Sequence, residues 1–423
     1  MVNPWHAGCD ILPRIATRFA ASTRVGDNAR PVPAARRRMS VVLTSPDSSL
    51  ADIGTPALVV DLVRLDRNIA RMNAIAARLG VRLRPHVKTA KCTAIARRIF
   101  GGIGPITVST LREAEHFLAD GFTDLRYAVG FAVARTARAA ALVRAGARLS
   151  LLVEDVATTQ AIAVAAAREN VRFDVLVEID ADGHRAGLRS DDARLIDVAR
   201  AAVDATHLDF AGVLTHAGGA YGCVGADALR AHAERERAAV AMAAARLSAA
   251  GIVCADVSVG STPTLTHAAG LSGVTEARAG VYVFGDLVQS NIGSCTIDDI
   301  ALSVLATVIS HKRDTGRVII DAGGLALSKD HGTAGQVVDY GYGQLCDIAG
   351  VPLDGLRVVE VNQEHGLVAP DRPGAVAAMF DTLPVGARVR VLPNHACMTA
   401  AAYDAYWVDD GTALRRWPRC NGW

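Results

Sequence analysis

The fold of this chain is decided by residues 55–88, TPALVVDLVRLDRNIARMNAIAARLGVRLRPHVK. Its first apolar run, Ala57–Asp61, predicts a short β-strand. Residues 63–79 predict a helix, because apolar side chains recur there at helical spacing until Gly80 ends the pattern. Residues 81–87 then predict a second strand. A strand, a helix and a strand in this order indicate an α/β protein.

The same alternation continues along the chain. Further strands are expected at residues 106–108, 125–128, 149–153, 173–179, 210–214, 256–259 and 276–279, with helices between them, the longest at 227–250. About eight such units predict a closed (β/α)8 barrel, a TIM barrel, rather than an open sheet. After about residue 291, alternating strings at 301–310, 317–321, 357–361 and 388–392 predict a mainly β domain. We therefore expect a barrel over residues 51–292 and a mainly β domain over residues 293–423.

Residues 1–50 differ from the rest of the chain. They are rich in arginine and proline and show no strong periodicity, which predicts a flexible extension. Their basic, acid-poor composition has a faint similarity to a transit peptide, but they lack the long apolar core of a secretory signal. The alternative is that translation starts at Met39 and the preceding residues are a misassigned start.

The bulk composition excludes several classes of protein. The 423 residues suffice for two domains, and 51% hydrophobic with 21% charged residues argues against wholesale disorder. A net charge of +2 argues against a nucleic-acid binder, and no apolar run has membrane-spanning length. The eight cysteines are irregularly spaced without a CxxC, which predicts a reduced, cytoplasmic protein.

The strongest chemical signal in the first half of the chain is Lys88. In a strand that ends there, Arg84, His86 and Lys88 share one face. Such a face is costly in a plain core but functional at the carboxyl mouth of a barrel. Neighbouring positive charge lowers the pKa of a lysine and frees its amine to form a Schiff base. The alternative is a surface strand end whose charges are solvated.

Three loops that follow predicted strands add weaker signals. Gly260, Ser261 and Thr262 follow the strand at 256–259, and their backbone N–H groups could cradle a phosphate, although an ordinary turn is equally compatible. Arg185 lies on a Gly-flanked acidic loop after the strand at 173–179. Tyr221 follows the strand at 210–214, near His216, an isolated histidine of the kind that is more often structural.

The second half of the chain carries His395 and Cys397, two residues apart after a predicted strand. An imidazole and a thiolate at this spacing can hold a zinc-like ion. A single HxC match is common by chance, and a zinc site wants about four ligands. The remaining positions must therefore come from water, substrate or distant side chains, and an open position suits catalysis.

Together these strings resemble the fold-type III pyridoxal-phosphate family, whose prototype barrel is alanine racemase. Within it the resemblance is to the metal-dependent branch of D-serine dehydratases, including dehydratases of D-threo-3-hydroxyaspartate, and D-threonine aldolases. It covers the chain from about residue 55 to the C-terminus. The matching strings are TPALVVD, RPHVKT, EIDADGHRAG, GSTPT, EARAGVYVFGD, DAGGLALSKD, NQEHG and PNHACMTAA.

The resemblance implies a role for each candidate residue. Lys88 would carry pyridoxal 5'-phosphate covalently, and His395 with Cys397 would hold a divalent metal, zinc before manganese or cobalt. The cofactor environment would be formed by Arg185, near the phenolic oxygen of the ring, and by Tyr221, Gly260, Ser261, Thr262, Gly280 and Tyr282. One departure is Ala90, where many relatives have a histidine, and it leaves open whether another orienting group is needed. The family also implies a homodimer.

The implied reaction is β-elimination of water from a D-β-hydroxy amino acid, such as D-serine or D-threo-3-hydroxyaspartate. Lys88 would remove the α-proton, the metal would help the β-hydroxyl leave, and hydrolysis of the enamine would give a 2-keto acid and ammonia. D-Threonine aldolase chemistry is the first rival, although the aldolases usually have Asp where this chain has Cys397. A non-catalytic pyridoxal-phosphate carrier, which would share the barrel alone, and an amino-acid racemase are further alternatives.

Overall fold

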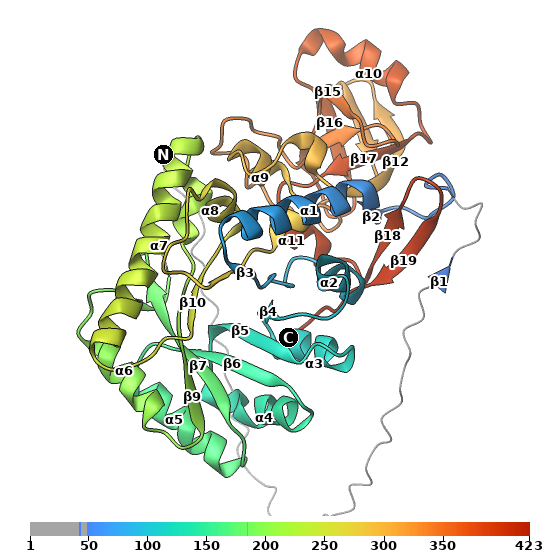
Figure 1. Cartoon of the computed structure of the whole chain (residues 1–423). Coiled ribbons are helices and arrows are strands. Elements are labelled where there is room, and N and C mark those ends of the chain that lie inside the picture. Colours follow the sequence, from blue (N-terminus) through green and yellow to red (C-terminus); the bar gives the residue numbers. More distant parts are fainter. Residues whose placement is uncertain (1–41, 44–48, 184) are drawn as a thin grey trace, which may run out of the picture. The chain divides into compact units, whose positions relative to one another are not determined.

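The computed structural model of the protein describes residues 42–43, 49–183 and 185–423 (Figure 1). The extension predicted for residues 1–50, with its alternative start at Met39, falls almost entirely on residues 1–41 and 44–48. That prediction therefore lies outside the described residues.

Within the described residues, eight parallel strands form a closed barrel. They pair in the order β3-β11-β10-β9-β7-β6-β5-β4, and a parallel bridge between His86 and Thr107 joins the two ends. The strands are β3 (Arg82–Leu83), β4 (Ile106–Val108), β5 (Asp124–Gly130), β6 (Arg148–Val153), β7 (Phe173–Asp180), β9 (Leu208–Thr215), β10 (Asp256–Val259) and β11 (Glu276–Ala277). The short β8 (Leu188–Arg189) pairs with β7. The predicted barrel is confirmed.

Helices alternate with these strands and flank the barrel (Figure 1). They are α1 (Leu62–Arg78), α2 (Thr93–Phe100), α3 (Leu111–Ala119), α4 (Thr136–Arg144), α5 (Val156–Arg168), α6 (Arg194–Val203), α7 (Ala226–Ala249) and α8 (Thr262–His267). Several begin at a side-chain cap: Asp61, Thr110 and Asp155 each accept a hydrogen bond from a backbone N–H of the first turn. Polar residues after the strands thus fix where the helices start.

The C-terminal part of the chain forms a second, antiparallel barrel. In the described chain six strands close it, in the order β12-β13-β16-β15-β14-β17 with β17 pairing back to β12. The strands are β12 (Leu302–Lys312), β13 (Arg317–Ile320), β14 (Gln344–Cys346), β15 (Pro352–Val361), β16 (Gly366–Pro370) and β17 (Arg388–Leu392). Beyond β12 the sheet continues through β2 (Ala57–Asp61), β18 (Ala405–Asp409), β19 (Leu414–Pro418) and β1 (Val42–Leu43). The short helices here are α9 (Leu287–Asn291), α10 (Val376–Thr382) and α11 (Ala396–Ala400).

Strand β2 forms where the sequence predicts a strand, but it does not belong to the parallel barrel. It pairs antiparallel with β12 and parallel with β18, and so lies in the sheet of the second domain. Its residues Ala57, Leu58, Val59 and Val60 are all buried. An apolar run of this kind suits any strand covered on both faces, so its composition does not select its sheet. The first strand of the parallel barrel is β3.

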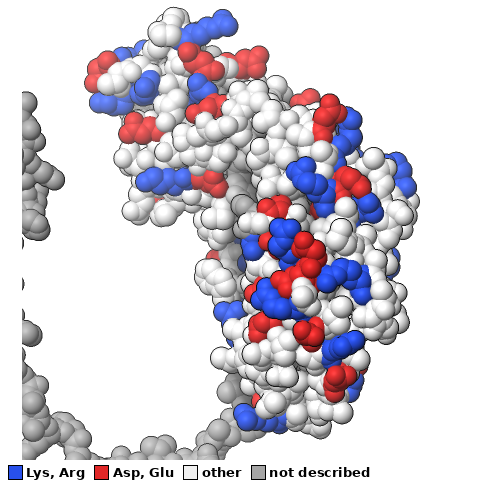
Figure 2. Space-filling view, turned by 90° about the vertical axis from the view of Figure 1, so that its left-hand side faces the viewer, with Lys and Arg blue, Asp and Glu red and all other residues white. Residues whose placement is uncertain are grey.

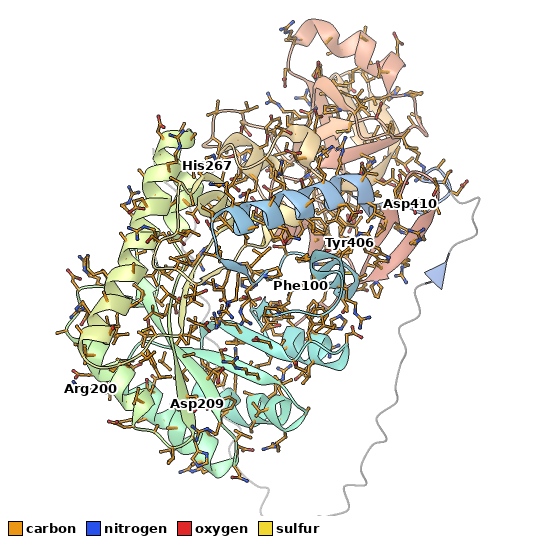
Figure 3. The ribbon with its side chains drawn as sticks, in the orientation of Figure 1. Phe100, Arg200, Asp209, His267, Tyr406 and Asp410 are labelled. Carbon is orange, nitrogen blue, oxygen red and sulfur yellow. The ribbon has the colours of Figure 1, made fainter. Side chains whose placement is uncertain are left out.

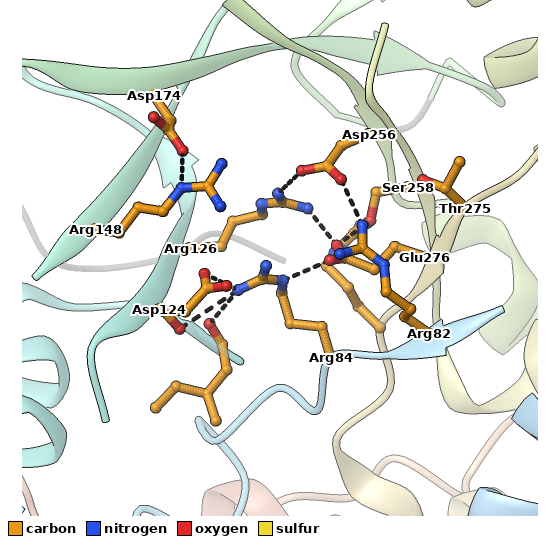
Figure 4. Close-up of polar contacts among 12 residues, drawn as sticks. Arg82, Arg84, Asp124, Arg126, Arg148, Asp174, Asp256, Ser258, Thr275 and Glu276 are labelled. Atoms are coloured by element: carbon orange, nitrogen blue, oxygen red, sulfur yellow. Dashed lines mark hydrogen bonds and ion pairs between the residues drawn. The ribbon is translucent and has the colours of Figure 1, made fainter. Parts of the chain in front are cut away.

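Charged side chains fill the barrel interior at the amino ends of the strands (Figure 4). Glu276 accepts hydrogen bonds from Arg84 (2.6 Å), Arg126 and the Ser258 hydroxyl (2.7 Å). Arg126 also pairs with Asp256 at 2.6 Å. Arg84, Arg126 and Glu276 are at most 2% exposed. Because buried charges are tolerated when they are paired, this network closes the floor of the barrel below the site.

The surface shows no single dominant charge on the face in Figure 2, where Lys and Arg side chains of the described residues alternate with Asp and Glu. This pattern accords with the net charge of +2. Across residues 42–43, 49–183 and 185–423, no helix combines the length and the apolar character needed to cross a membrane.

Candidate active site

A cavity of about 470 Å³ opens at the carboxyl ends of the barrel strands, where catalytic residues of such barrels lie. Residues of both domains line it. The cavity brings together most of the candidates named from the sequence: Lys88, Arg185, Tyr221, Gly260, Ser261, Thr262, Gly280, His395 and Cys397. The barrel thus supplies the lysine, and the second domain supplies the histidine and the cysteine.

Beyond β3 the backbone runs parallel to β4 as far as the bridge at His86, and Lys88 lies on the turn of residues 87–90 that follows. Arg84 points into the charged floor and His86 lines the cavity above it, as strand periodicity predicts, whereas the turn brings Lys88 into the same cavity. The Lys88 pKa lies below its ordinary value, because burial disfavours the ammonium ion and the charges of Arg185 and Arg278 add to this effect, against Cys397 and Glu113. A larger share of neutral amine makes Lys88 a better nucleophile and base.

The turn that carries Lys88 ends at Lys91. Lys91 has a φ of 48°, and its N–H donates to the Val87 carbonyl at 2.7 Å. The Lys91 ammonium pairs with Glu113 at 3.0 Å. Ala90 is buried and faces a separate small apolar cavity, so a side chain at this position would not point at the site. The group beside Lys88 in the cavity is His86, which burial keeps neutral by lowering its pKa well below the ordinary value.

The loop after β10 depends on glycine. Gly260 has a φ of +152°, and a Cβ there would collide with the Arg278 carbonyl. Ser261 caps α8 by accepting from the Thr264 N–H at 3.2 Å, and the Thr262 hydroxyl accepts from the Tyr282 N–H at 3.2 Å. The result is a tight turn of small residues on the cavity wall, which is the kind of cradle that a phosphate group fits.

Two buried side chains hold this turn. His216 Nδ1 lies 2.6 Å from the Gly260 carbonyl oxygen, so Nδ1 donates and Nε2 remains as an acceptor. Burial lowers the pKa of His216 to about 3, which keeps the imidazole neutral. Glu236 of α7 accepts from the Gly260 N–H (3.2 Å) and the Ala217 N–H (3.0 Å). His216 is therefore both a cavity residue and a structural one.

His395 and Cys397 lie at the start of α11, directly after β17. His395 Nδ1 donates to Asp330 Oδ2 at 3.1 Å, and the imidazole also shares a hydrogen bond with the Cys397 side chain. Metal-binding histidines usually donate their second ring N–H to a carboxylate in this way. Cys397 Sγ donates to the Thr89 hydroxyl at 3.2 Å, beside Lys88. Although burial raises the pKa of Cys397, His395, Thr89 and Lys88 outweigh it and lower the pKa, which favours the thiolate that binds metals.

Two acidic residues that sequence reasoning did not assign support this pair. Asp330 reaches His395 after two residues of positive φ, Ser328 at 69° and Lys329 at 52°. Asp286 accepts from the Ala396 N–H at 3.0 Å and from the Gln289 N–H at 2.8 Å. Both aspartates end strings that carry the family resemblance, EARAGVYVFGD and DAGGLALSKD. Both residues were therefore quoted from the sequence but assigned no function. In the described part of the chain no three His, Cys, Asp or Glu residues form a metal-binding group.

The side chain of Tyr282 departs from the prediction, because it lies outside the cavity. It borders a separate small cavity with Met72, Ser294 and Cys295, and its hydroxyl has no hydrogen-bond partner among the described residues. The short 3-10 turn at Val281–Val283 carries the ring away from the cavity wall formed by Gly280. Arg278, which was not assigned a role, lines the cavity instead, and its guanidinium donates to the Ser258 hydroxyl at 2.6 Å.

Comparisons with known proteins agree with this architecture. Residues 60–288 match the family model of the alanine racemase N-terminal domain, and residues 301–408 match that of a serine dehydratase domain. The chain is 50% identical over 379 residues to D-threo-3-hydroxyaspartate dehydratase of Delftia sp. (89% of this chain, 99% of the relative). It is 30% identical over 387 residues to D-serine dehydratase of Dictyostelium discoideum (86% and 95%).

Among solved structures, D-threo-3-hydroxyaspartate dehydratase from Delftia sp. HT23 superposes with a TM-score of 0.87 at 49% identity. The match covers 89% of this chain and 100% of that one. The match therefore extends over both domains. The chain belongs to the fold-type III pyridoxal-phosphate family and, within it, to the lyases of the D-serine dehydratase and D-threonine aldolase branch.

Proposed function

We propose that this protein eliminates water from D-threo-3-hydroxyaspartate, giving oxaloacetate and ammonia, with pyridoxal phosphate and a divalent metal as cofactors. The observation that carries the proposal is the meeting of Lys88 with His395 and Cys397 in one cavity. The choice of substrate is supported by the 50% identity to a dehydratase of that compound over 99% of its length. D-Serine is the second substrate that we expect, with pyruvate as product.

The cavity residues fit the organic cofactor. Lys88 offers a buried amine of lowered pKa for its attachment, and the turn formed by Gly260, Ser261 and Thr262 offers a cradle for its phosphate. When bound, pyridoxal phosphate supplies an electron sink for charge that develops at the substrate α-carbon. Lys88 then holds or moves the α-proton, while the neutral His86 and His216 line the wall without adding charge.

The second domain fits a metal. His395 is oriented by Asp330 through Nδ1, and the thiol of Cys397 is favoured as thiolate, so an imidazole nitrogen and a sulfur are offered on the same wall. Zinc suits this donor pair best, with manganese or cobalt as alternatives. Such an ion supplies a Lewis acid that helps a β-hydroxyl leave. Asp286 fixes the backbone between the two ligands through the Ala396 N–H.

The second domain argues against two alternative functions of the same site, a non-catalytic carrier and an aldolase. A carrier would need the barrel alone, whereas here His395 and Cys397 extend the cavity. Retro-aldol cleavage would give glycine and an aldehyde, and Cys397, where aldolases usually have Asp, favours elimination. We further propose a cytoplasmic homodimer, because the family resemblance implies a dimer and the described cysteines are free thiols.

The test is product analysis with purified protein and pyridoxal phosphate. D-threo-3-hydroxyaspartate, D-serine and D-threonine are each offered with and without a chelator. We expect oxaloacetate and ammonia from the first substrate, loss of both products with the chelator, and recovery with zinc or manganese. Glycine with an aldehyde would place the protein among the aldolases. Absence of turnover from all three compounds, despite a lysine-bound cofactor, would refute the dehydratase proposal.

A further inference from the structure

Arg419 is a buried arginine that stands outside the cavity and joins several segments around it. It directly follows β19 and is 6% exposed. Its guanidinium donates to five oxygens: the carbonyls of Ala90 (3.2 Å), Tyr403 (2.8 Å) and Ala400, the hydroxyl of Tyr406 (2.7 Å) and the side-chain carbonyl of Asn421 (3.1 Å). A buried cation needs such a set of acceptors, because burial without hydrogen bonds is costly.

These contacts connect the two halves of the candidate active site. Ala90 lies two residues after Lys88, and Ala400 ends α11, three residues after Cys397. The Tyr406 hydroxyl donates to the same Ala90 carbonyl at 2.7 Å and accepts from Arg419. Tyr406, labelled in Figure 3, is fully buried. Arg419 and Tyr406 therefore tie the lysine segment of the barrel to the end of the metal-pair helix.

The contacts at the two ends of α11 are complementary. At its start, the Ala396 N–H donates to Asp286, a residue of the chain that follows β11. At its end, the Ala400 carbonyl, one of the carbonyls that a helix leaves unsatisfied, accepts from Arg419. A cation near the last carbonyls of a helix is also favourable for the helix dipole. Cys397 sits between these two attachments, with its sulfur 3.2 Å from the Thr89 hydroxyl.

The chain end reinforces the same connection. The Cys420 N–H donates to the Lys91 carbonyl at 2.8 Å, and the Arg419 N–H donates to the Asp404 carbonyl at 2.8 Å. The C-terminus accordingly lies beside β4 and α3 in Figure 1. The backbone of Arg419 and of the next residue is thus held by hydrogen bonds, so the Arg419 side chain has a defined position between the segments that it joins.

We propose that Arg419, together with Tyr406, is a positioning residue that sets the place of Cys397 relative to Lys88. The proposal rests on the metal-dependent function proposed above. Neither residue lines the cavity, so neither touches substrate or cofactor. If α11 shifts when the connection is cut, the metal pair loses its alignment while the barrel keeps Lys88 and the phosphate turn. Metal affinity and turnover then fall, and the lysine-bound cofactor remains.

The test compares Arg419→Lys, Tyr406→Phe and the control Arg416→Lys, an exposed residue of β19. The zinc Kd of each cofactor-loaded protein is measured by competition with a chelator, beside the lysine-bound cofactor absorbance and the Tm. We expect Arg419→Lys to raise the Kd about tenfold or more, as loss of metal-site supporting contacts does. Tyr406→Phe, which removes one hydroxyl, should raise it less, and the control should match the wild type. Cofactor content should be equal in all four proteins.

Two results would overturn the proposal. One is a zinc Kd for Arg419→Lys and Tyr406→Phe equal to that of the control. The other is a parallel loss of zinc affinity, cofactor content and Tm, which would make the residues merely structural. If Arg419→Lys does not fold, Tyr406→Phe alone decides between these results. Failure of the proposed function would appear separately, as wild-type protein that binds zinc but forms no keto acid.

Discussion

The contact between Asp330 and His395 makes a quantitative prediction about metal binding. Asp330 Oδ2 accepts from His395 Nδ1 at 3.1 Å, and this hydrogen bond holds the pKa of Asp330 below its ordinary value, so the carboxylate is ionised at neutral pH. When the imidazole binds a metal through Nε2, this hydrogen bond keeps Nδ1 protonated, and it raises the basicity of the ring. Substitution of Asp330 should therefore weaken metal binding without touching either predicted ligand.

The size of the effect follows from what each substitution leaves behind. Loss of a carboxylate that supports a ligating histidine costs about 10–100-fold in metal affinity, which corresponds to about 1.4–2.7 kcal/mol. Asp330→Asn keeps an oxygen that can accept from Nδ1 but loses the charge that strengthens the bond, so about tenfold is expected. Asp330→Ala leaves the imidazole without this partner and free to rotate, so the expected loss lies toward about 100-fold.

The assay is a zinc titration of the metal-free, cofactor-loaded protein in competition with a chelator of known affinity. Asp314→Asn is a matched control, because Asp314 is 70% exposed and pairs with Lys312 at the surface. The ranking of zinc affinity should be wild type and control first, then Asn, then Ala. Affinities of both Asp330 variants within threefold of the control would refute the reasoning, since His395 would then be oriented by other contacts.

Three further predictions concern the barrel. Lys88→Ala should abolish covalent cofactor binding and lower turnover by about 10²–10⁴-fold or more, measured by absorbance and keto-acid formation, because the positioned base is lost. Glu276→Gln should lower the free energy of unfolding in urea by about 3 kcal/mol, because Arg84 and Arg126 lose a shared buried counter-charge and keep only Asp124 and Asp256; an unchanged unfolding midpoint would contradict this. Burial, followed by the negative charge of Glu154, raises the pKa of Glu178 from 4.5 to about 7. The neutral carboxyl therefore stabilises the folded protein. This contribution is complete below about pH 4.5 and is lost as the pH rises through about 7. The Tm of cofactor-free Glu178→Gln should thus match that of the wild type at low pH and exceed it above pH 7, and parallel curves would contradict the assignment.

Local sequence patterns predicted most of the strands and helices, but they did not predict which strands pair with one another. The alternation of strands and helices predicted the parallel barrel, because each βα unit repeats the same short-range signals. Strand β2 was assigned to the wrong sheet, since its four buried apolar residues would suit either one. Its partners, β12 and β18, lie more than 200 residues away in sequence, and single-strand composition carries no information about such pairing.

The residues of the candidate site also divide into those that local sequence properties identified and those that they did not. Lys88, His395 and Cys397 were found from residue type and spacing, which are local properties. Asp330 was not found, because its contact with His395 depends on the positive φ of Ser328 and Lys329. No turn-forming residue in the sequence predicts this conformation. The family resemblance implied that Tyr282 belongs to the cofactor environment, whereas a 3-10 turn directs its ring to a separate small cavity.

The division of the site between two domains bears on what selects the reaction. The barrel supplies an amine, a turn of small residues and neutral histidines, which in the proposed function would bind pyridoxal phosphate and labilise an α-proton. A β-hydroxyl is a poor leaving group, so elimination is helped by a Lewis acid, which a metal held by His395 and Cys397 would supply in the function proposed above. The pair and the helix α11 that carries it are contacted by Asp330, Asp286 and Arg419, none of which belongs to a strand of the parallel barrel. We infer that the barrel determines the common chemistry of the family, and that the residues that fix α11 against it determine whether a captured amino acid loses water.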